Sequence, residues 1–163
     1  MGTLLKGLQR VQWGDLGAAR GATAGDIPAL LSKAAWSDEG TASMAVDELA
    51  DLICELGFVV QEATAPTVPF LVELAGATHM ACKADVLALL LKVFNGRQWS
   101  AAAEAAPPKY DSNYTEQVGW EAASKQAERA GQPIFRELAR STDPQFAEAA
   151  AELLQAIAAA ATQ

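Results

Sequence analysis

Asp26-Ile27-Pro28-Ala29-Leu30-Leu31 is a stretch whose pattern recurs twice further along the chain, as Thr67-Val68-Pro69-Phe70-Leu71-Val72 and as Gly131-Gln132-Pro133-Ile134-Phe135. Residues of the same kind also recur 2, 6, 9, 17, 21 and 24 positions after each proline. The matched sets are Leu30, Leu71 and Phe135; Ala34, Ala75 and Ala139; Ser37, Thr78 and Thr142; Ala45, Val86 and Ala150; Leu49, Leu90 and Leu154; and Leu52, Val93 and Ile157. Such recurrence indicates stacked copies of one supersecondary unit, none of which can bury its apolar face alone.

Each copy predicts a pair of helices. The proline suits the first turn of the first helix, where its missing N–H would have no partner in any case, and Asp26 and Thr67 are placed to cap that turn. The hydroxyl residues Ser37, Thr78 and Thr142 are expected at the start of the second helix, where a side-chain oxygen can accept from free backbone N–H groups. The offsets of 17, 21 and 24 differ by four and three, which predicts one apolar stripe along the second helix.

A short first helix, a tight turn and a longer second helix are typical of HEAT-like repeats. We therefore expect one all-α domain over residues 1–163, a right-handed α-solenoid of about three to four HEAT-like helical pairs without a sheet. The expected parts are an N-terminal cap at 1–25, helix pairs at 26–56, 65–95 and 132–161, and an inserted loop plus helix at 96–131.

The insertion separates the second and third copies, because Pro69 and Pro133 are 64 residues apart whereas Pro28 and Pro69 are 41 apart. Residues 95–113 predict a loop with one helical turn at 100–106, since they contain Asn-Gly and Pro-Pro. Residues 115–130 predict a further helix. Its expected core side chains are Val118, Ala122 and Ala123.

Charge is distributed unevenly along a chain whose net charge is −8. Residues 1–33 carry four basic and two acidic side chains, and residues 83–163 carry eight basic and ten acidic ones. Residues 34–82 hold eight acids and no lysine or arginine. The balances of +2 and −2 cancel, so this middle segment alone accounts for the net charge.

Acids spaced four residues apart predict an exposed ridge on the second helix of the first unit, and acids at comparable places are expected on the later second helices. Like charges at this spacing destabilise a helix slightly. Two explanations stay open: a solvated face of an acidic protein, or a docking surface whose field steers a basic partner. The candidate partner-binding acids are Asp47, Glu48, Asp51, Glu55, Asp85, Glu148 and Glu152.

Aromatic residues gather in and after the insertion, and Trp99, Tyr110 and Tyr114 are candidate anchors for a partner, because Trp and Tyr dominate interface hot spots. The alternative is that they fold back as a lid over the neighbouring units. Trp120 is expected to cover the gap between those units.

Several function classes lack their sequence signals. There is no Gly-rich phosphate loop, Gly-x-Ser-x-Gly or Cys-x-x-Cys motif, so we expect no catalytic residues. Cys54 and Cys82 are expected to be buried free thiols, and the single histidine, His79, to be a solvated residue at a helix start, so we expect neither a metal nor a cofactor. Basic residues are interleaved with acids, which argues against nucleic acid as a partner. Without a long apolar segment or leader, we expect a cytoplasmic protein with no membrane partner.

The chain resembles small bacterial HEAT-repeat proteins of actinobacterial type. The resemblance rests on Asp26–Leu31, Asp47-Glu48-Leu49, Ile53-Cys54 and Ala63–Leu74, and it is strongest over residues 26–94. Members often carry histidine after the cysteine, where this chain has Glu55. The resemblance implies an α-solenoid and little about activity.

Two functions follow as hypotheses. The first is a non-enzymatic protein-binding module, with a cytoplasmic immunity or antitoxin protein that neutralises a basic toxin through an acidic concave surface as its specific version. The alternative is a HEAT-like enzyme such as a DNA glycosylase, or a lyase-type chaperone. A DNA glycosylase on this scaffold relies on a basic concave face, which the sequence does not predict.

Overall fold

A computed structural model describes residues 4–77 and 82–161, and it shows that the chain is all-α, as the sequence predicts. The expected helix starts at Thr78 and His79 lie outside the described residues. The helices are α1 (Ile27–Trp36), α2 (Glu39–Ile53), α3 (Thr64–Gly76), α4 (Lys83–Asn95), α5 (Gln98–Ala105), α6 (Thr115–Ala130), α7 (Gln132–Ala139) and α8 (Pro144–Ala161). Short 3-10 turns cover Lys6–Arg10, Trp13–Asp15, Ala19–Gly21, Ala24–Asp26 and Asp111–Tyr114.

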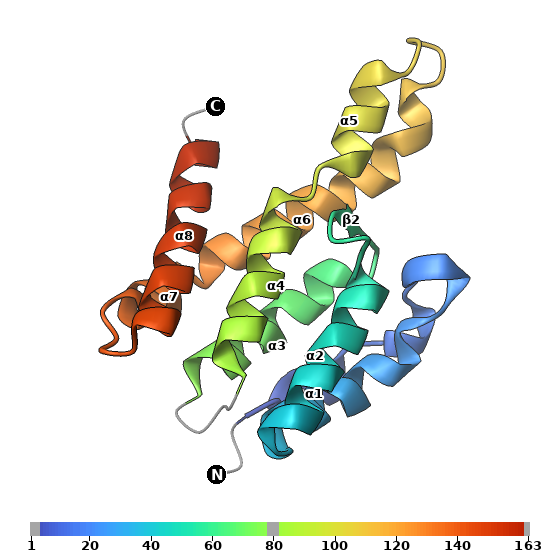
Figure 1. Cartoon of the computed structure of the whole chain (residues 1–163). Coiled ribbons are helices and arrows are strands. Elements are labelled where there is room, and N and C mark those ends of the chain that lie inside the picture. Colours follow the sequence, from blue (N-terminus) through green and yellow to red (C-terminus); the bar gives the residue numbers. More distant parts are fainter. Residues whose placement is uncertain (1–3, 78–81, 162–163) are drawn as a thin grey trace.

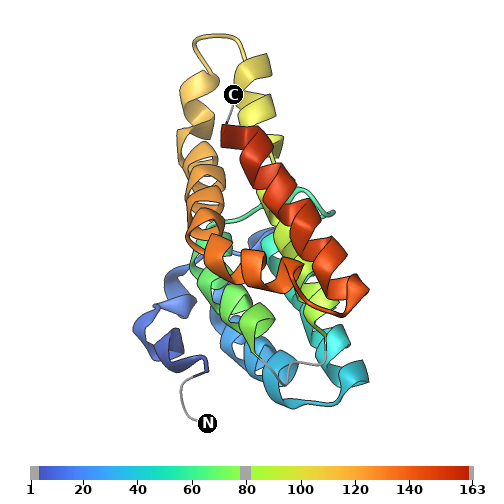
Figure 2. The same cartoon turned by 90° about the vertical axis from the view of Figure 1, so that its left-hand side faces the viewer.

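The helices lie in two layers (Figure 1). In one layer, α4 packs between α2 and α8. In the other, α3 packs against α1, α6 and α7. The pairs α1–α2, α3–α4 and α7–α8 each pack together, while α5 packs along α6. The resulting α5–α6 hairpin projects beyond the rest of the molecule, which is clearest in the view of Figure 2.

The repeated apolar positions of the second helices form the centre of the core. Leu49, Val86, Leu90 and Val93 are fully buried, and Ala45, Ala150 and Ile157 are at most 2% exposed. Leu52 and Leu154 are half-buried. Since burying a leucine or valine side chain contributes about 1.5–3 kcal/mol, this stripe is a large part of what holds the two layers together.

On α2 and α8, the capping residue lies one position after the repeated hydroxyl. The Asp38 Oδ1 atom accepts from the backbone N–H of Thr41 at 2.9 Å, and this hydrogen bond lowers the pKa of Asp38. On α8, Asp143 accepts from the N–H of Gln145. The expectation that Ser37 and Thr142 serve as caps was wrong, because a carboxylate at the next position takes the free N–H groups.

Pro28 and Pro133 occupy the first turn of their helices, but Pro69 does not. Helix α3 begins at Thr64, so Pro69 lies inside it. Thr67 is not a cap either, since its hydroxyl donates to the carbonyl of Ala63 within the helix.

A two-residue antiparallel ribbon follows α2, so the expectation of no sheet was wrong. Strand β1 (Cys54–Glu55) pairs with β2 (Val59–Val60). The turn between them places Leu56 at φ 59° and Gly57 at φ 86°. Gly96, at the end of α4, lies against this ribbon: a Cβ atom there would come within 2.9 Å of the Phe58 carbonyl oxygen. The close approach explains why the chain has glycine at that position.

Two acids of the middle segment fasten the N-terminal residues to the helices. Glu62 accepts from the N–H of Gly17 at 2.8 Å, and Glu73 accepts from the N–H of Leu5 at 3.1 Å. The buried Trp13 ring packs against Phe70, with 5.9 Å between ring centroids. The described N-terminal residues thus form a series of 3-10 turns, which packs against the core through Trp13.

The insertion is more helical than the sequence predicts, since α5 occupies eight residues where a single turn was expected. On α6, the expectation that Ala122 and Ala123 face the core was wrong, because both are exposed. The buried face of α6 instead carries Glu121, Ser124 and Glu128. Polar side chains therefore occupy the inward side of the helix that joins the projecting hairpin to the body.

Candidate functional site

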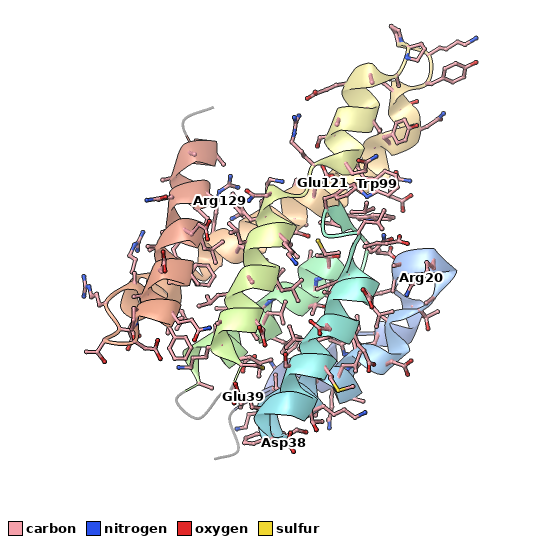
Figure 3. The ribbon with its side chains drawn as sticks, viewed as in Figure 1. Arg20, Asp38, Glu39, Trp99, Glu121 and Arg129 are labelled. Carbon is pink, nitrogen blue, oxygen red and sulfur yellow. The ribbon has the colours of Figure 1, made fainter. Side chains whose placement is uncertain are left out.

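Three acids of α2 lie together on its solvent side, and we call Asp47, Glu48 and Asp51 the α2 acidic face. All three side chains are exposed, and within residues 4–77 and 82–161 none takes part in an ion pair. Arg20 lines a depression of about 210 Å³ together with Glu48 and Asp51. Figure 3 shows Arg20 on the N-terminal segment beside α2, with Asp38 and Glu39 at the opposite end of the helix.

The predicted ridge is shorter than expected. Helix α2 ends at Ile53, so Glu55 belongs to β1 and does not continue the helical i, i+4, i+8 series. Asp85 is exposed on α4 and accepts from the Ser43 hydroxyl of α2 at 2.9 Å. Glu148 and Glu152 are exposed on α8, which packs on the far side of α4 from α2. The structure thus brings Asp85 next to α2 and leaves the α8 acids in a separate position.

Exposed apolar side chains flank the α2 acidic face, and the sequence analysis missed them. Met44 is 66% exposed on α2 itself. At the C-terminal end of α2, Leu56 is 79% exposed and Phe58 is 45% exposed in the β1–β2 turn. A positive φ is unfavourable for leucine by roughly 1–2 kcal/mol, so the turn presents Leu56 to solvent at a conformational cost. A leucine at a turn position that favours glycine or asparagine is the sequence signal that could have identified it.

The aromatic residues of the insertion divide into two groups. Trp99 is half-buried, donates from Nε1 to the carbonyl of Val60 at 2.8 Å, and packs edge-to-face on Trp120. Tyr114 is also half-buried, with its ring centroid 6.4 Å from that of Trp99. Tyr110 is 46% exposed at the tip of the hairpin, with the Lys109 ammonium 4.8 Å from its ring centroid. Trp99 and Tyr114 therefore hold the hairpin together, whereas Tyr110 is available at its tip.

This division predicts different effects of two alanine substitutions. We expect Tyr114→Ala to lower the melting temperature, because it removes an aromatic contact worth about 0.5–1.5 kcal/mol together with buried ring surface. Tyr110→Ala is expected to leave the melting temperature within about 1 °C of the wild type, since most surface substitutions change stability by less than about 0.5 kcal/mol. Thermal unfolding followed by circular dichroism measures both. Equal destabilisation by the two substitutions would contradict the assignment.

Glu121 is buried on α6, and its side chain caps the N-terminus of the neighbouring helix α5. Its carboxylate accepts from the N–H groups of Trp99 and Ser100, at 2.8 and 3.0 Å, and from the Ser100 hydroxyl. These N–H groups belong to the first turn of α5, which has no cap from its own chain segment. Figure 3 shows Glu121 and Trp99 close together at the base of the hairpin. A carboxylate at a helix N-terminus also interacts favourably with the helix dipole.

Glu128 lies on the same face of α6, seven residues after Glu121, and is fully buried. Neither of its carboxylate oxygens has a hydrogen-bond partner within the described part of the chain. Burial raises the pKa of Glu128 well above its usual value, and the positive charge of Lys125 opposes this only in part. Residues 121, 124 and 128 are spaced by three and four, which is a helical periodicity. The sequence alone did not identify this face because the alanines of α6 compete with it as the apolar side.

Neither the cysteines nor the metal-ligating side chains of the described residues form a further site. Cys54 and Cys82 are buried free thiols, as predicted, and burial raises the pKa of each to about 11. Within residues 4–77 and 82–161, no three histidine, cysteine or acidic side chains are grouped so that they could hold a metal ion. In the same ranges, no helix combines the length and apolar character needed to cross a membrane.

Comparison of this chain with models of protein families, with curated proteins and with solved structures gives no match.

Proposed function

We propose that the chain is a non-enzymatic protein-binding module built from HEAT-like helical pairs, and that it docks a basic partner on the α2 acidic face and the adjoining β1–β2 turn. The observation that carries this proposal is the combination of Asp47, Glu48 and Asp51 with the exposed Leu56 and Phe58 at the end of the same helix. An immunity or antitoxin role against a basic toxin is the specific form that we put forward.

The two parts of this surface would serve different steps of binding. Of the eight acids in residues 34–82, Asp38, Glu62 and Glu73 bond backbone N–H groups, whereas the acids of the α2 face are free to attract a partner. Exposed acids of this kind raise the association rate by steering a basic partner. Leu56 and Phe58 supply apolar area that a partner can bury, which slows dissociation.

The proposal predicts that a substitution at Leu56 weakens partner binding without lowering the stability of the fold. We expect Leu56→Asn to weaken partner binding at least tenfold while stability stays equal or rises by about 1 kcal/mol, because asparagine tolerates a positive φ better than leucine does. Asp47→Lys together with Asp51→Lys is expected to slow association about tenfold at low salt and much less at about 0.5 M salt. Glu137→Lys, an exposed charge reversal on α7, is the matched control.

The partner is first isolated by affinity purification from the native host, and each variant is then compared with the wild type by surface plasmon resonance and thermal unfolding. A partner that is retained by Glu137→Lys and lost with the other variants supports the proposal. Suppression of that partner's toxicity by co-expression of this chain supports the immunity role. If the partner binds Leu56→Asn and the double charge reversal as tightly as the wild type, the α2 face is not the docking surface.

A further inference from the structure

A second hollow lies away from the α2 acidic face. It is a cleft of about 410 Å³ lined by residues of α4, α5, α6 and α8. One wall is apolar and consists of Phe94 and of alanines on α8. The polar lining consists of Asn95, Arg97, Ser100, Glu104 and Lys125. This volume falls within the range of small-molecule sites, which combine an apolar lining with a few polar groups.

Three cations gather around the cleft in a chain whose net charge is −8. Lys125 is half-buried, and its Nζ atom lies 5.8 Å from the ring centroid of Phe94. The Arg129 guanidinium lies 5.7 Å from the same centroid, and Figure 3 shows this side chain rising from α6 between α4 and α8. Arg97 is on the rim. Two cations over one aromatic ring repel each other unless an anion lies nearby.

The acids nearest these cations are paired elsewhere or are disfavoured as anions by burial. Glu104 pairs with Arg97 at 3.2 Å on the exposed rim. Glu121 uses its carboxylate to cap α5. Burial raises the pKa of Glu128, which favours its neutral form. Burial lowers the pKa of Lys125, and Coulombic attraction to Glu121 and Glu128 opposes this shift. An anion beside Lys125 would stabilise its ammonium form further.

The Lys125 ammonium also has donors to spare. Within the described residues it donates one hydrogen bond, to the carbonyl of Gly96 at 3.0 Å. An ammonium group carries three donors, so two remain for a ligand. The Ser100 hydroxyl in the same lining already donates to Glu121. Arg97 uses its Nη2 group on Glu104, so its other guanidinium N–H groups are left for an oxyanion.

We propose that this cleft binds a small organic anion, a phosphate or carboxylate carried on an apolar body. The oxyanion takes hydrogen bonds from Lys125 and Arg97, while the apolar body lies against Phe94 and the small side chains of α8. Arg129 does not line the cleft and contributes positive charge from beside the Phe94 ring. The site is separate from the α2 acidic face and does not depend on the function proposed for that face.

The test is titration of the purified protein with phenyl phosphate, inorganic phosphate and benzyl alcohol, followed by calorimetry and by chemical-shift changes in the backbone NMR spectrum. We expect phenyl phosphate to bind most tightly, inorganic phosphate more weakly and the neutral alcohol not at all. Lys125→Met keeps the apolar stem of the side chain and is expected to weaken phenyl phosphate binding about tenfold. Lys33→Met, an exposed lysine on α1, is the matched control with unchanged affinity.

Arg97→Gln is the second variant, because its exposed side chain can be changed without loss of the fold if Lys125→Met unfolds the protein. It is expected to weaken binding about threefold and to leave shift changes confined to residues around the cleft. Equal binding of phenyl phosphate by Arg97→Gln, Lys33→Met and the wild type would overturn the proposal. So would tighter binding of benzyl alcohol than of phenyl phosphate, or shift changes that map to another part of the molecule.

Discussion

Glu128→Gln raises the free energy of unfolding by about 2 kcal/mol at pH 8, and the melting temperature by roughly 4–8 °C, as the expected result of removing a carboxyl group that has no hydrogen-bond partner within the described residues. In the unfolded chain this carboxyl group ionises above about pH 4.5, so folding at pH 8 must either protonate it or bury its charge, and glutamine avoids both costs. Glutamine keeps the size and shape of the side chain, so the change creates no cavity.

The effect has a defined dependence on pH. The folded-state pKa of Glu128 is raised above its ordinary value of 4.5, so folding favours the protonated form. The stability that this proton provides is complete below the unfolded pKa and is lost as the pH rises toward the folded pKa. The difference between Glu128→Gln and the wild type should therefore be small below pH 4.5 and grow with rising pH.

Urea unfolding of both proteins from pH 4 to pH 8 measures this difference, and other titrating groups cancel because they are common to both chains. Glu152→Gln, which changes an exposed acid on α8, serves as the control and should show no such trend. A wild type that is more stable than Glu128→Gln at pH 8 would show that the carboxylate is ionised and satisfied.

Glu121→Ala has the opposite effect, and we expect it to lower the free energy of unfolding by about 3 kcal/mol and the melting temperature by roughly 6–12 °C. The substitution leaves the N–H groups of Trp99 and Ser100 and the Ser100 hydroxyl without their acceptor. Hydrogen bonds to a charged group contribute about 1.5–3 kcal/mol each, and part of this loss is recovered when water enters.

Hydrogen exchange locates the damage as well as measuring it. Protection should fall most within α5, because its first turn loses its cap, and less in α2 and α4. Glu116→Ala, at an exposed position of α6, is the matched control and should change neither stability nor exchange appreciably. If the amides of α5 exchange in Glu121→Ala as slowly as in the wild type, the side chain is not the cap of that helix.

These two expectations give α6 a specific role in the molecule. Glu121 holds the base of the projecting hairpin and Lys125 of the same helix lines the cationic cleft, whereas the α2 acidic face lies on another part of the surface. The proposed protein-docking surface and the proposed anion cleft can therefore be tested separately. Phenyl phosphate binding should be unchanged in Asp47→Lys with Asp51→Lys, since neither residue lines the cleft.

The local pattern of the sequence was sufficient to predict the helical pairs. Pro28 and Pro133 mark helix starts because a proline in the first turn needs no hydrogen-bond donor. The spacing of Leu49, Leu90 and their equivalents shows which side of each second helix is buried, since apolar residues three and four apart share one face. These are properties of neighbouring residues, and periodicity records them directly.

The exposure of the α2 acids could also be expected from their place between the apolar positions. The point at which the acidic ridge ends could not be predicted from the sequence. Glu55 leaves α2 because β1 pairs with β2, and this pairing requires the space that Gly96 leaves for the turn. Leu56 and Phe58 likewise became candidate anchors only once the turn was seen to point them into solvent.

The sequence by itself determined that the chain is all-α, where its principal helices lie and that its negative charge is concentrated in residues 34–82, because each of these follows from composition and short-range spacing. Only the tertiary structure decided which polar groups meet. Arg97, Lys125 and Arg129 are interleaved with acids along the chain, yet folding brings Arg97 and Lys125 to one cleft and places Arg129 beside the Phe94 ring that lines it. Glu121 reaches the start of α5 from 22 residues away, and the Glu128 carboxyl group is enclosed with no hydrogen-bond partner among the described residues. Long-range packing sets the distances between charged side chains and their access to water. It therefore decides which of them pair and which are buried, and local sequence patterns do not record this.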